Sequence, residues 1–363
     1  MYKVKIFGAG SIGNHLSHAA RTLNWAVDIA DVSEDALNRT KEEIYPSRYG
    51  KWDDSIGLYH NDNIPKNIYD LIIVGTPPDS HMELAINAIQ EKPKAILIEK
   101  PLCTPDLSQA QKFFELMKSS NVKVFVGYDH VIGKASCEVG NIIQQNDIGD
   151  IETIDVEFRE HWGGIFNAHP WLSGPQDTYL GYWKKGGGAS GEHSHAINLW
   201  QNFAHVCNAG RVVKVTGNLK YVEESGTSYD KICALNLETE KGLIGRVVQD
   251  VVTKPPRKWG RVQGSQGFVE WYCGNKPNCD TVLANNCEDK SQEVLIEKNR
   301  PDDFILELKH IEEVVNGNGQ QSPISIERGL DTMLIVAAAH KSAIEKRTVT
   351  IDYSKGYVPE ALS

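Results

Sequence analysis

The first third of the chain alternates between short apolar runs and longer amphipathic stretches. The runs at residues 2–7, 70–75 and 122–126 are long enough for buried strands and too short for helices. Strand and helix follow each other in turn, which predicts a parallel sheet with right-handed crossover connections. The expected strands are residues 2–7, 26–30, 70–75, 95–98 and 122–126, and the expected helices are residues 11–23, 81–90 and 108–119, with a short helix after Ser33.

The pattern changes near residue 130. Alternating runs at residues 212–222, 231–238, 242–252 and 261–272 have no helical stretch between them, which is typical of an antiparallel sheet. The other elements expected in this half are helices at residues 134–144, 189–205, 301–315 and 325–345, strands at residues 151–159 and 349–352, and a long irregular loop at residues 161–185. The sequence therefore predicts an α/β N-terminal domain, residues 1–128, and an α+β C-terminal domain, residues 129–363, with a large, open, mostly antiparallel sheet.

Three glycines follow the first expected strand in the spacing G-x-G-x-x-G, and the first expected helix begins among them. Gly8 allows a tight turn, Gly10 lets a pyrophosphate approach the backbone, and Gly13 lets the helix pack close to the strand. The helix N-terminus offers N–H groups and a positive dipole end to phosphates. The motif predicts a dinucleotide-binding Rossmann domain; the alternative is a glycine turn that binds nothing.

An acidic residue at the end of the second strand decides which dinucleotide is expected. Asp31 can accept hydrogen bonds from the adenosine ribose and would repel a 2′-phosphate. The next residues are Val32 and Ser33, and no arginine follows at once. NAD is therefore the expected cofactor, and NADP is less favoured.

Charge and composition exclude several classes of partner. The chain has 363 residues, of which 40% are hydrophobic and 24% charged, and a formal net charge of -10. This charge disfavours nucleic acid and anionic membranes, and no apolar stretch approaches the ~20 residues of a membrane span. The seven cysteines are scattered and odd in number, which favours free thiols in a reducing compartment. We expect a cytoplasmic protein without a signal peptide.

Two groups of residues raise the question of a metal. Cys273, Cys279 and Cys287 cluster, but they lack a C-x-x-C pair and a nearby histidine. Glutamate and histidine three residues apart, as in Glu192 and His195, can chelate in helical bundles, but no further ligand set is evident. No metal is expected.

Ligands of such parallel sheets lie beyond the carboxyl ends of the strands. Together with the glycine motif, T-P-P-D-S-H at Thr76 to His81, E-K-P at Glu99 to Pro101, and G-G-G followed by a histidine-bearing helix make this chain similar to the Gfo/Idh/MocA oxidoreductases. E-K-P is the most specific of these motifs, and the resemblance covers nearly the whole chain. The cofactor-binding residues expected from the motifs are Gly8, Gly10, Ser11, Ile12, Gly13, Asp31, Thr76, Pro77, His81, Glu99 and Lys100.

The resemblance implies NAD(P)-dependent oxidation or reduction of a sugar, cyclic polyol or sugar derivative. It also implies a homodimer or homotetramer formed through the C-terminal sheet. The family's lysine in E-K-P maps onto Lys100 and its helix histidine onto His195. The family commonly places an aspartate four residues before that histidine, where this chain has Gly191. Glu192, on the same helical face as His195, or His193 then takes its role.

Oxidation of an alcohol needs a proton acceptor and a donor to the developing oxyanion. His195 is the expected base, because imidazole titrates near neutral pH, and Lys100 the expected donor, with Glu192 as their partner. The alternatives without a catalytic role are a surface lysine for Lys100, a core histidine for His195 and an acid in the first turn of a helix for Glu192. The expected substrate-binding residues are Lys100, Asp129, His130, Trp162, Trp171, Trp183, His193 and His195, the tryptophans offering flat faces to a sugar ring.

Two other functions compete with a dehydrogenase. One is a regulatory protein that senses the cofactor without turnover, against which Lys100 and His195 count. The other is a lyase or glycosidase that uses NAD transiently. Net accumulation of NADH distinguishes the three functions: a dehydrogenase accumulates NADH, the transient user of NAD does not, and the sensor only binds the cofactor.

Overall fold

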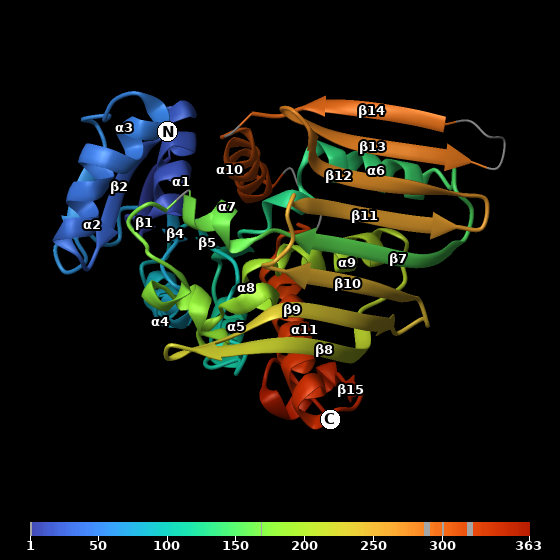
Figure 1. Ribbon diagram of the computed structural model, residues 1–363. Coiled ribbons are helices and arrows are strands. Elements are labelled where there is room, and N and C mark those ends of the chain that lie inside the picture. Colours follow the sequence, from blue (N-terminus) through green and yellow to red (C-terminus); the bar gives the residue numbers. More distant parts are fainter. Residues whose placement is uncertain (1, 168, 287–290, 300, 318–321) are drawn as a thin grey trace.

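A computed structural model describes residues 2–167, 169–286, 291–299, 301–317 and 322–363. Figure 1 shows two sheets lying beside each other, with the N-terminal half in blue and the larger sheet in orange, yellow and green. Among the described residues, no helix is both long and apolar enough to span a membrane. The described cysteines are free thiols, and Cys287 lies outside the described residues.

The first sheet is six-stranded and entirely parallel, in the order β3-β2-β1-β4-β5-β6. This order confirms the Rossmann prediction, with the switch point between β1 and β4. The strands are β1 (Lys3–Phe7), β2 (Ala26–Asp31), β3 (Gly57–His60), β4 (Leu71–Val74), β5 (Ala95–Ile98) and β6 (Lys123–Val126). The helices are α1 (Ser11–Thr22), α2 (Glu34–Arg39), α3 (Tyr45–Tyr49), α4 (Pro78–Gln90) and α5 (Ala110–Lys118), with a π-helical turn at Thr40–Ile44.

The second sheet has nine strands in the order β14-β13-β12-β11-β7-β10-β9-β8-β15. All its neighbours are antiparallel except β7 and β10, which confirms a mostly antiparallel sheet. Its strands are β7 (Ile151–Arg159), β8 (Val212–Glu224), β9 (Thr227–Thr239), β10 (Ile244–Asp250), β11 (Arg257–Gly264), β12 (Gly267–Lys276), β13 (Cys279–Asn286), β14 (Ser291–Glu297) and β15 (Val349–Thr350).

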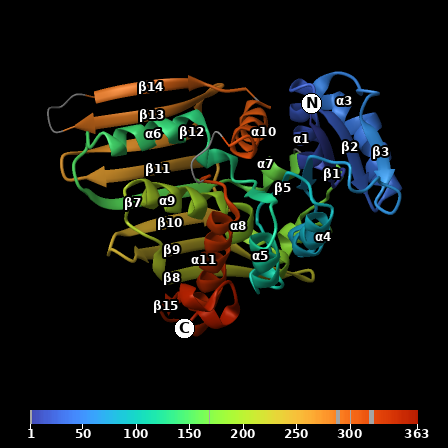
Figure 2. The ribbon, with the colours of Figure 1, turned by 180° about the vertical axis from the view of Figure 1, so that it is seen from behind.

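Helices cover one face of this sheet. Seen from behind, α6 (Lys134–Gln144), α9 (His195–Val206) and α11 (Ile326–Glu345) lie in front of the strands (Figure 2). Their apolar residues form the core with the inward side chains of the sheet, among them Trp200, Phe203 and Trp271. No helix of the described part of the chain covers the opposite face.

The predicted strand at residues 261–272 is wrong in its extent. The structure divides this region into β11 and β12, which form a hairpin with the pair Gly264 and Gly267 at its turn. Side chains at these two positions would collide with the carbonyl oxygens of Ile148 and Asn285. The turn is thus set by close contacts with distant segments. The strands β3, β13 and β14 were also missed.

The predicted continuous helix at residues 189–205 is wrong as well. It consists of α8 (Gly188–Glu192) and α9, separated by a break at His193 and Ser194. Because of this break, Glu192 and His195 do not share one helical face.

Late segments of the chain return to the first sheet. Helix α10 (Asp302–Val315) packs on α1, where Phe304 stacks on His15 at 5.1 Å between ring centroids. Residues at the start of α11 reach β6, and Ser325 bridges to Phe125. These contacts place side chains of the C-terminal part of the chain beside the first sheet and its helix α1, which follows the glycine motif.

Candidate active site

A cavity of about 770 Å³ lies at the carboxyl ends of the first sheet, and both halves of the chain line it. Gly10, Thr76, Lys100 and Asp129 face it from the first half, and His195 from the second. The expected site residues that line it are Gly10, Ser11, Ile12, Thr76, Pro77, Glu99, Lys100, Asp129, His130, Trp171, Glu192, His193 and His195.

The glycine motif fits a dinucleotide phosphate. A side chain at Gly8, which has φ +106°, would lie 2.6 Å from the carbonyl oxygen of Gly75, and one at Gly13 would collide with the carbonyl of Gly8. A side chain at Gly10 would meet no protein atom within 4 Å, and Gly10 lines the cavity. Protein packing therefore explains two of the glycines, while the third leaves space at the start of α1 for a ligand.

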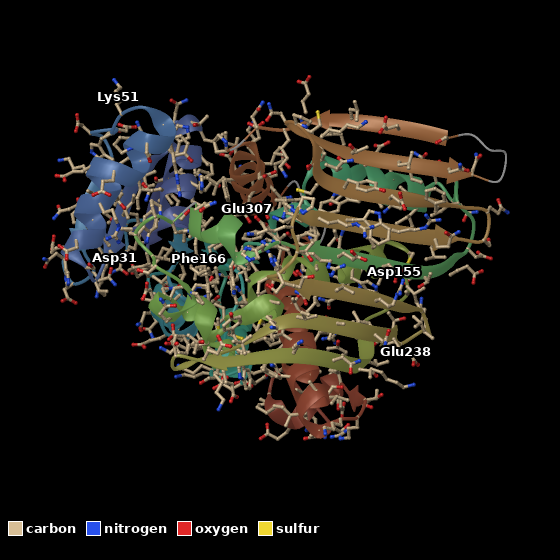
Figure 3. All side chains as sticks on the ribbon, in the orientation of Figure 1. Asp31, Lys51, Asp155, Phe166, Glu238 and Glu307 are labelled. Carbon is tan, nitrogen blue, oxygen red and sulfur yellow. The ribbon has the colours of Figure 1, made fainter. Side chains whose placement is uncertain are left out.

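Asp31 anchors the same loop. Its carboxylate accepts hydrogen bonds from the backbone N–H of Ala9 at 2.8 Å and of Ser33 at 2.9 Å. Asp31 does not line the cavity, but Figure 3 shows it in the N-terminal half, at the end of β2. Its direct effect is to hold the turn that carries Gly10.

His81 does not face the cavity. It is buried in α4, and its ring nitrogens lie 2.6 Å and 3.1 Å from the carbonyl oxygens of Thr76 and Pro101. It thus links the two strand ends that carry Thr76 and Lys100.

Lys100, at the end of β5, is bound to the second half of the chain. Its Nζ donates to the carboxylate and to the backbone oxygen of Glu192, both at 3.0 Å. Burial alone would raise the pKa of Glu192, but Lys100 and then His193 outweigh it and lower this pKa. An ammonium has three N–H donors, so one remains for a ligand.

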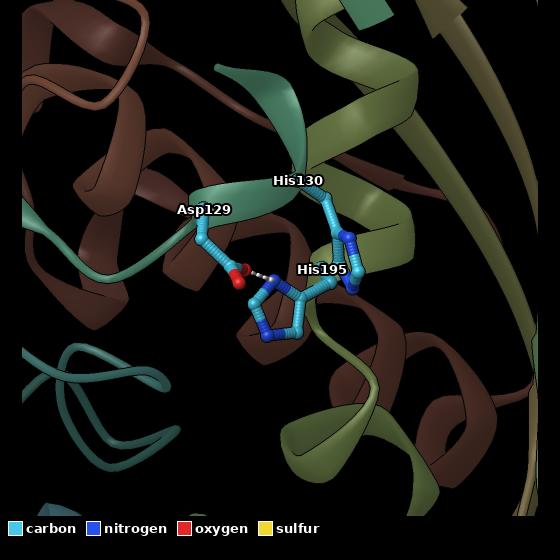
Figure 4. Close-up of side chains that lie close together, drawn as sticks. All are labelled: Asp129, His130 and His195. Carbon is cyan, nitrogen blue, oxygen red and sulfur yellow. Dashed lines mark ion pairs between the residues drawn. The ribbon is translucent and has the colours of Figure 1, made fainter. Parts of the chain in front are cut away.

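The position that the family gives to an aspartate cannot hold one here. A side chain at Gly191 would collide with the carbonyl oxygen of Gly186. The carboxylate beside His195 comes instead from Asp129, directly after β6, with Oδ1 3.7 Å from Nδ1 (Figure 4). The expectation that Glu192 or His193 is the partner of His195 is therefore corrected.

His195 lies among aromatic rings, near His130 at 4.8 Å and Tyr128 at 5.5 Å between centroids. Its Nδ1 is buried and has no hydrogen-bond partner among the described residues. Burial, and then the neighbouring His130, lower the pKa of His195 well below its usual value, although Asp129 acts in the opposite direction. This lowered pKa favours the neutral imidazole, whereas the sequence suggested a titration near neutral pH.

His193 also faces the cavity from the break between α8 and α9. It is 4% exposed, and its Nε2 has no hydrogen-bond partner among the described residues. Burial lowers the pKa of His193 to about 4. It is a second neutral imidazole that a ligand can contact.

The three expected tryptophans have different environments. Trp171 lines the cavity, and the guanidinium of Arg39 lies 5.4 Å from its ring. Trp162 packs on Phe166 and Tyr229, and Trp183 stacks on His340. Neither of these two lines the cavity. The lining residues that the sequence analysis missed include Phe158, Glu160, Tyr179, Lys258 and Glu307.

Asp129, His130 and His195 each offer an atom that could ligate a metal, and these atoms lie within 4.8 Å of one another. The same arrangement is that of an imidazole beside an orienting carboxylate. We assign no metal to these residues.

Comparison with known proteins identifies the family. A model of an oxidoreductase family with an NAD-binding Rossmann fold matches residues 2–128, and a Gfo/Idh/MocA C-terminal domain model matches residues 138–270. The chain therefore belongs to the Gfo/Idh/MocA oxidoreductases, and it is an NAD-binding enzyme.

Solved structures with the same fold include several sugar and polyol enzymes. Levoglucosan dehydrogenase in complex with NADH and levoglucosan has a TM-score of 0.77 at 16% identity, covering 96% of this chain and 98% of that one. A putative myo-inositol dehydrogenase from Sinorhizobium meliloti gives 0.72 at 18%, covering 96% and 99%. An aldose-aldose oxidoreductase from Caulobacter crescentus gives 0.74 at 16%, also covering 96% and 99%.

A curated relative matches a shorter stretch. It is Oxidoreductase P35 of Formosa agariphila, which is 26% identical over 97 residues, or 27% of this chain and 30% of the relative. The match therefore covers less than two thirds of that protein.

Proposed function

We propose that this enzyme transfers a hydride between NAD and a secondary alcohol of a sugar, cyclic polyol or sugar derivative. The observation that carries the proposal is that Lys100 and His195 line one cavity together with Gly10. The names of the structural relatives support the substrate class. NAD, when bound along the glycine loop and the ends of β4 and β5, supplies the hydride acceptor.

In the oxidation direction, His195 accepts the hydroxyl proton. Its lowered pKa keeps the ring unprotonated, and Asp129 beside Nδ1 stabilises the imidazolium that forms. The proton is thus held on the ring of His195, where the positive charge of the imidazolium develops, rather than being passed to bulk water.

Lys100 stabilises the alkoxide. Two of its N–H groups are fixed by Glu192, so the third points in a defined direction and costs little reorganisation when the oxygen becomes negative. Glu192 is in this view the residue that positions Lys100.

The substrate would lie between the sheet-end residues and the loop that follows β7. Trp171, Tyr179 and Phe158 supply flat surfaces there. His130 and His193 supply ring nitrogens for hydroxyl groups.

A screen of sugars, inositols and anhydro sugars with NAD tests the proposal. Net accumulation of NADH with oxidation of one carbinol carbon is expected. Product without net NADH would identify a lyase or glycosidase, and cofactor binding without product from any of these compounds would identify a sensor. A chelator should leave the rate unchanged; a lost rate that Zn²⁺ or Mg²⁺ restores would contradict the metal-free assignment.

The domain boundary after residue 128 and a dimer or tetramer through the uncovered sheet face remain predictions. Light scattering of the purified protein would test the second.

A further inference from the structure

Glu307 is a buried carboxylate without a partner. It lies in the middle of α10, is 1% exposed, and neither of its oxygens has a hydrogen-bond partner among the described residues. It also lines the cavity, near the junction of the two halves of the molecule (Figure 3). A buried polar group without a hydrogen-bond partner costs free energy, so the position favours a ligand that supplies the partner that the protein does not.

The charged groups that act on Glu307 are acidic. They are Glu99 at the end of β5, Asp129 after β6, and Asp303 one turn earlier on α10. Burial first, and then these carboxylates, raise the pKa of Glu307 well above its usual range. Asp303 is neutralised by Lys298 at 3.1 Å. A positively charged ligand group near Glu307 would act against the effect of Asp129 and favour the carboxylate form of Glu307.

Glu307 lies on the cofactor side of the cavity. One turn before it, Phe304 stacks on His15 of α1, the helix that begins at the glycine loop. Its neighbour Glu99 packs against Gly75 and Gly127 at the ends of the parallel strands. These are the strand ends beyond which the nicotinamide half of a dinucleotide lies in this fold.

We propose that Glu307 is a cofactor-binding residue that distinguishes the oxidised from the reduced nicotinamide and favours NAD⁺ over NADH. The nicotinamide ring carries a positive charge in NAD⁺ and none in NADH, and its carboxamide N–H groups can donate to the free carboxylate oxygens. Both forms can make this carboxamide contact, but only the ring of NAD⁺ is also attracted by the negative charge of a carboxylate in this position. The inference needs the NAD site but not the sugar substrate.

The proposal has a consequence for protons. The raised pKa favours the protonated form of Glu307 in the free enzyme; the positive ring would stabilise the carboxylate, and the proton would pass to the solvent. Binding of NAD⁺ therefore releases a proton from Glu307, whereas binding of NADH does not.

Calorimetry with NAD⁺ and with NADH, in buffers of different ionisation enthalpy, tests both statements. We expect Glu307→Gln to weaken NAD⁺ by about 10- to 100-fold, the scale of one nearby charge at intermediate dielectric, and to leave NADH within about threefold. Proton release on NAD⁺ binding should fall in the variant. The matched control is Glu313→Gln, an exposed glutamate of the same helix, which should change nothing.

Equal losses for both cofactors, or an unchanged affinity ratio, would overturn the inference. Equal proton release with NAD⁺ and NADH by the unmodified enzyme would overturn it without any variant. Turnover of a sugar alcohol with an unchanged affinity ratio would leave the proposed reaction standing, so the two proposals can fail separately.

Discussion

Two histidines, the buried His340 on α11 and the partly buried His195 at the start of α9, have opposite environments. His340, on α11, lies within hydrogen-bonding distance of Ser190 at 3.0 Å through Nε2 and of Tyr221 at 2.8 Å through Nδ1. His195 has an unpartnered Nδ1 beside a carboxylate. Burial lowers the pKa of both, that of His340 to about 3. Burial and pKa alone do not separate the structural histidine from the proposed base; the hydrogen bonds do.

The same distinction applies to the carboxylates. Asp230 accepts hydrogen bonds from the backbone N–H and the hydroxyl of Ser190 at 2.8 and 3.0 Å, and so fixes the start of α8. Glu307, equally buried, accepts none among the described residues. In these two pairs, the group that holds the architecture is satisfied by the protein, whereas the group at the cavity has an unpartnered atom that a ligand can contact. The predictions below test this comparison.

The largest effect is expected at His195. His195→Asn should lower kcat by roughly 10²–10⁴, the scale of a lost general base. The melting temperature and the affinity for NADH should stay nearly unchanged, because Nδ1 makes no hydrogen bond that folding needs. Steady-state kinetics, calorimetry and thermal unfolding measure the three quantities. A large loss of stability with little loss of rate would make His195 a structural residue.

The glycine motif offers a second contrast between packing and ligand space. Gly10→Val should fold normally, since a Cβ at this position meets no protein atom within 4 Å. It should weaken NADH by about 100-fold or more, because the branched side chain fills the phosphate space. Fluorescence titration gives the affinity and circular dichroism the fold. NADH binding at unmodified strength would show that this loop does not hold the phosphates.

A histidine-to-asparagine substitution at His340, whose two ring nitrogens both have hydrogen-bond partners, should instead affect stability. His340→Asn leaves the hydroxyls of Ser190 and Tyr221 without their ring partner and should lower the free energy of unfolding by about 1–3 kcal/mol. The affinity for NADH should hardly change, since His340 does not line the cavity. Denaturant unfolding and calorimetry measure the two quantities. An unchanged free energy of unfolding would contradict the structural assignment.

The smallest expected effect is on the pH dependence of stability. Burial raises the pKa of Asp230 to about 7 and that of Glu99 to about 8. A carboxyl group with a raised pKa stabilises the folded state below its unfolded pKa, and this stability is lost as pH rises through the folded value. The free energy of unfolding should therefore fall between pH ~6.5 and ~8.5, and Asp230→Asn should remove about 1 kcal/mol of that fall. Denaturant melts across this range measure it; an identical slope in the variant would contradict the raised pKa.

Local sequence signals were sufficient to predict most of the N-terminal, NAD-binding part of the chain. The strand, glycines and helix from Tyr2 to Thr22 are contiguous, and each glycine has a reason in the backbone itself. The apolar runs of the parallel strands likewise follow from burial on both faces. The sequence by itself therefore determined the Rossmann sheet apart from β3, the NAD cofactor and the strand ends at which the cavity lies.

The arrangement of the proposed catalytic residues depends on contacts between segments that are distant in the sequence. Lys100 and Glu192 are 92 residues apart, and Asp129 and Glu307 approach the site from separate elements. A helical periodicity placed Glu192 and His195 on one face, but in the folded chain α8 ends at Glu192 and α9 begins at His195. Which carboxylate accompanies the histidine, which tryptophan faces the cavity and which acid is left unpartnered were decided by the tertiary structure alone, because each depends on packing that no local pattern encodes.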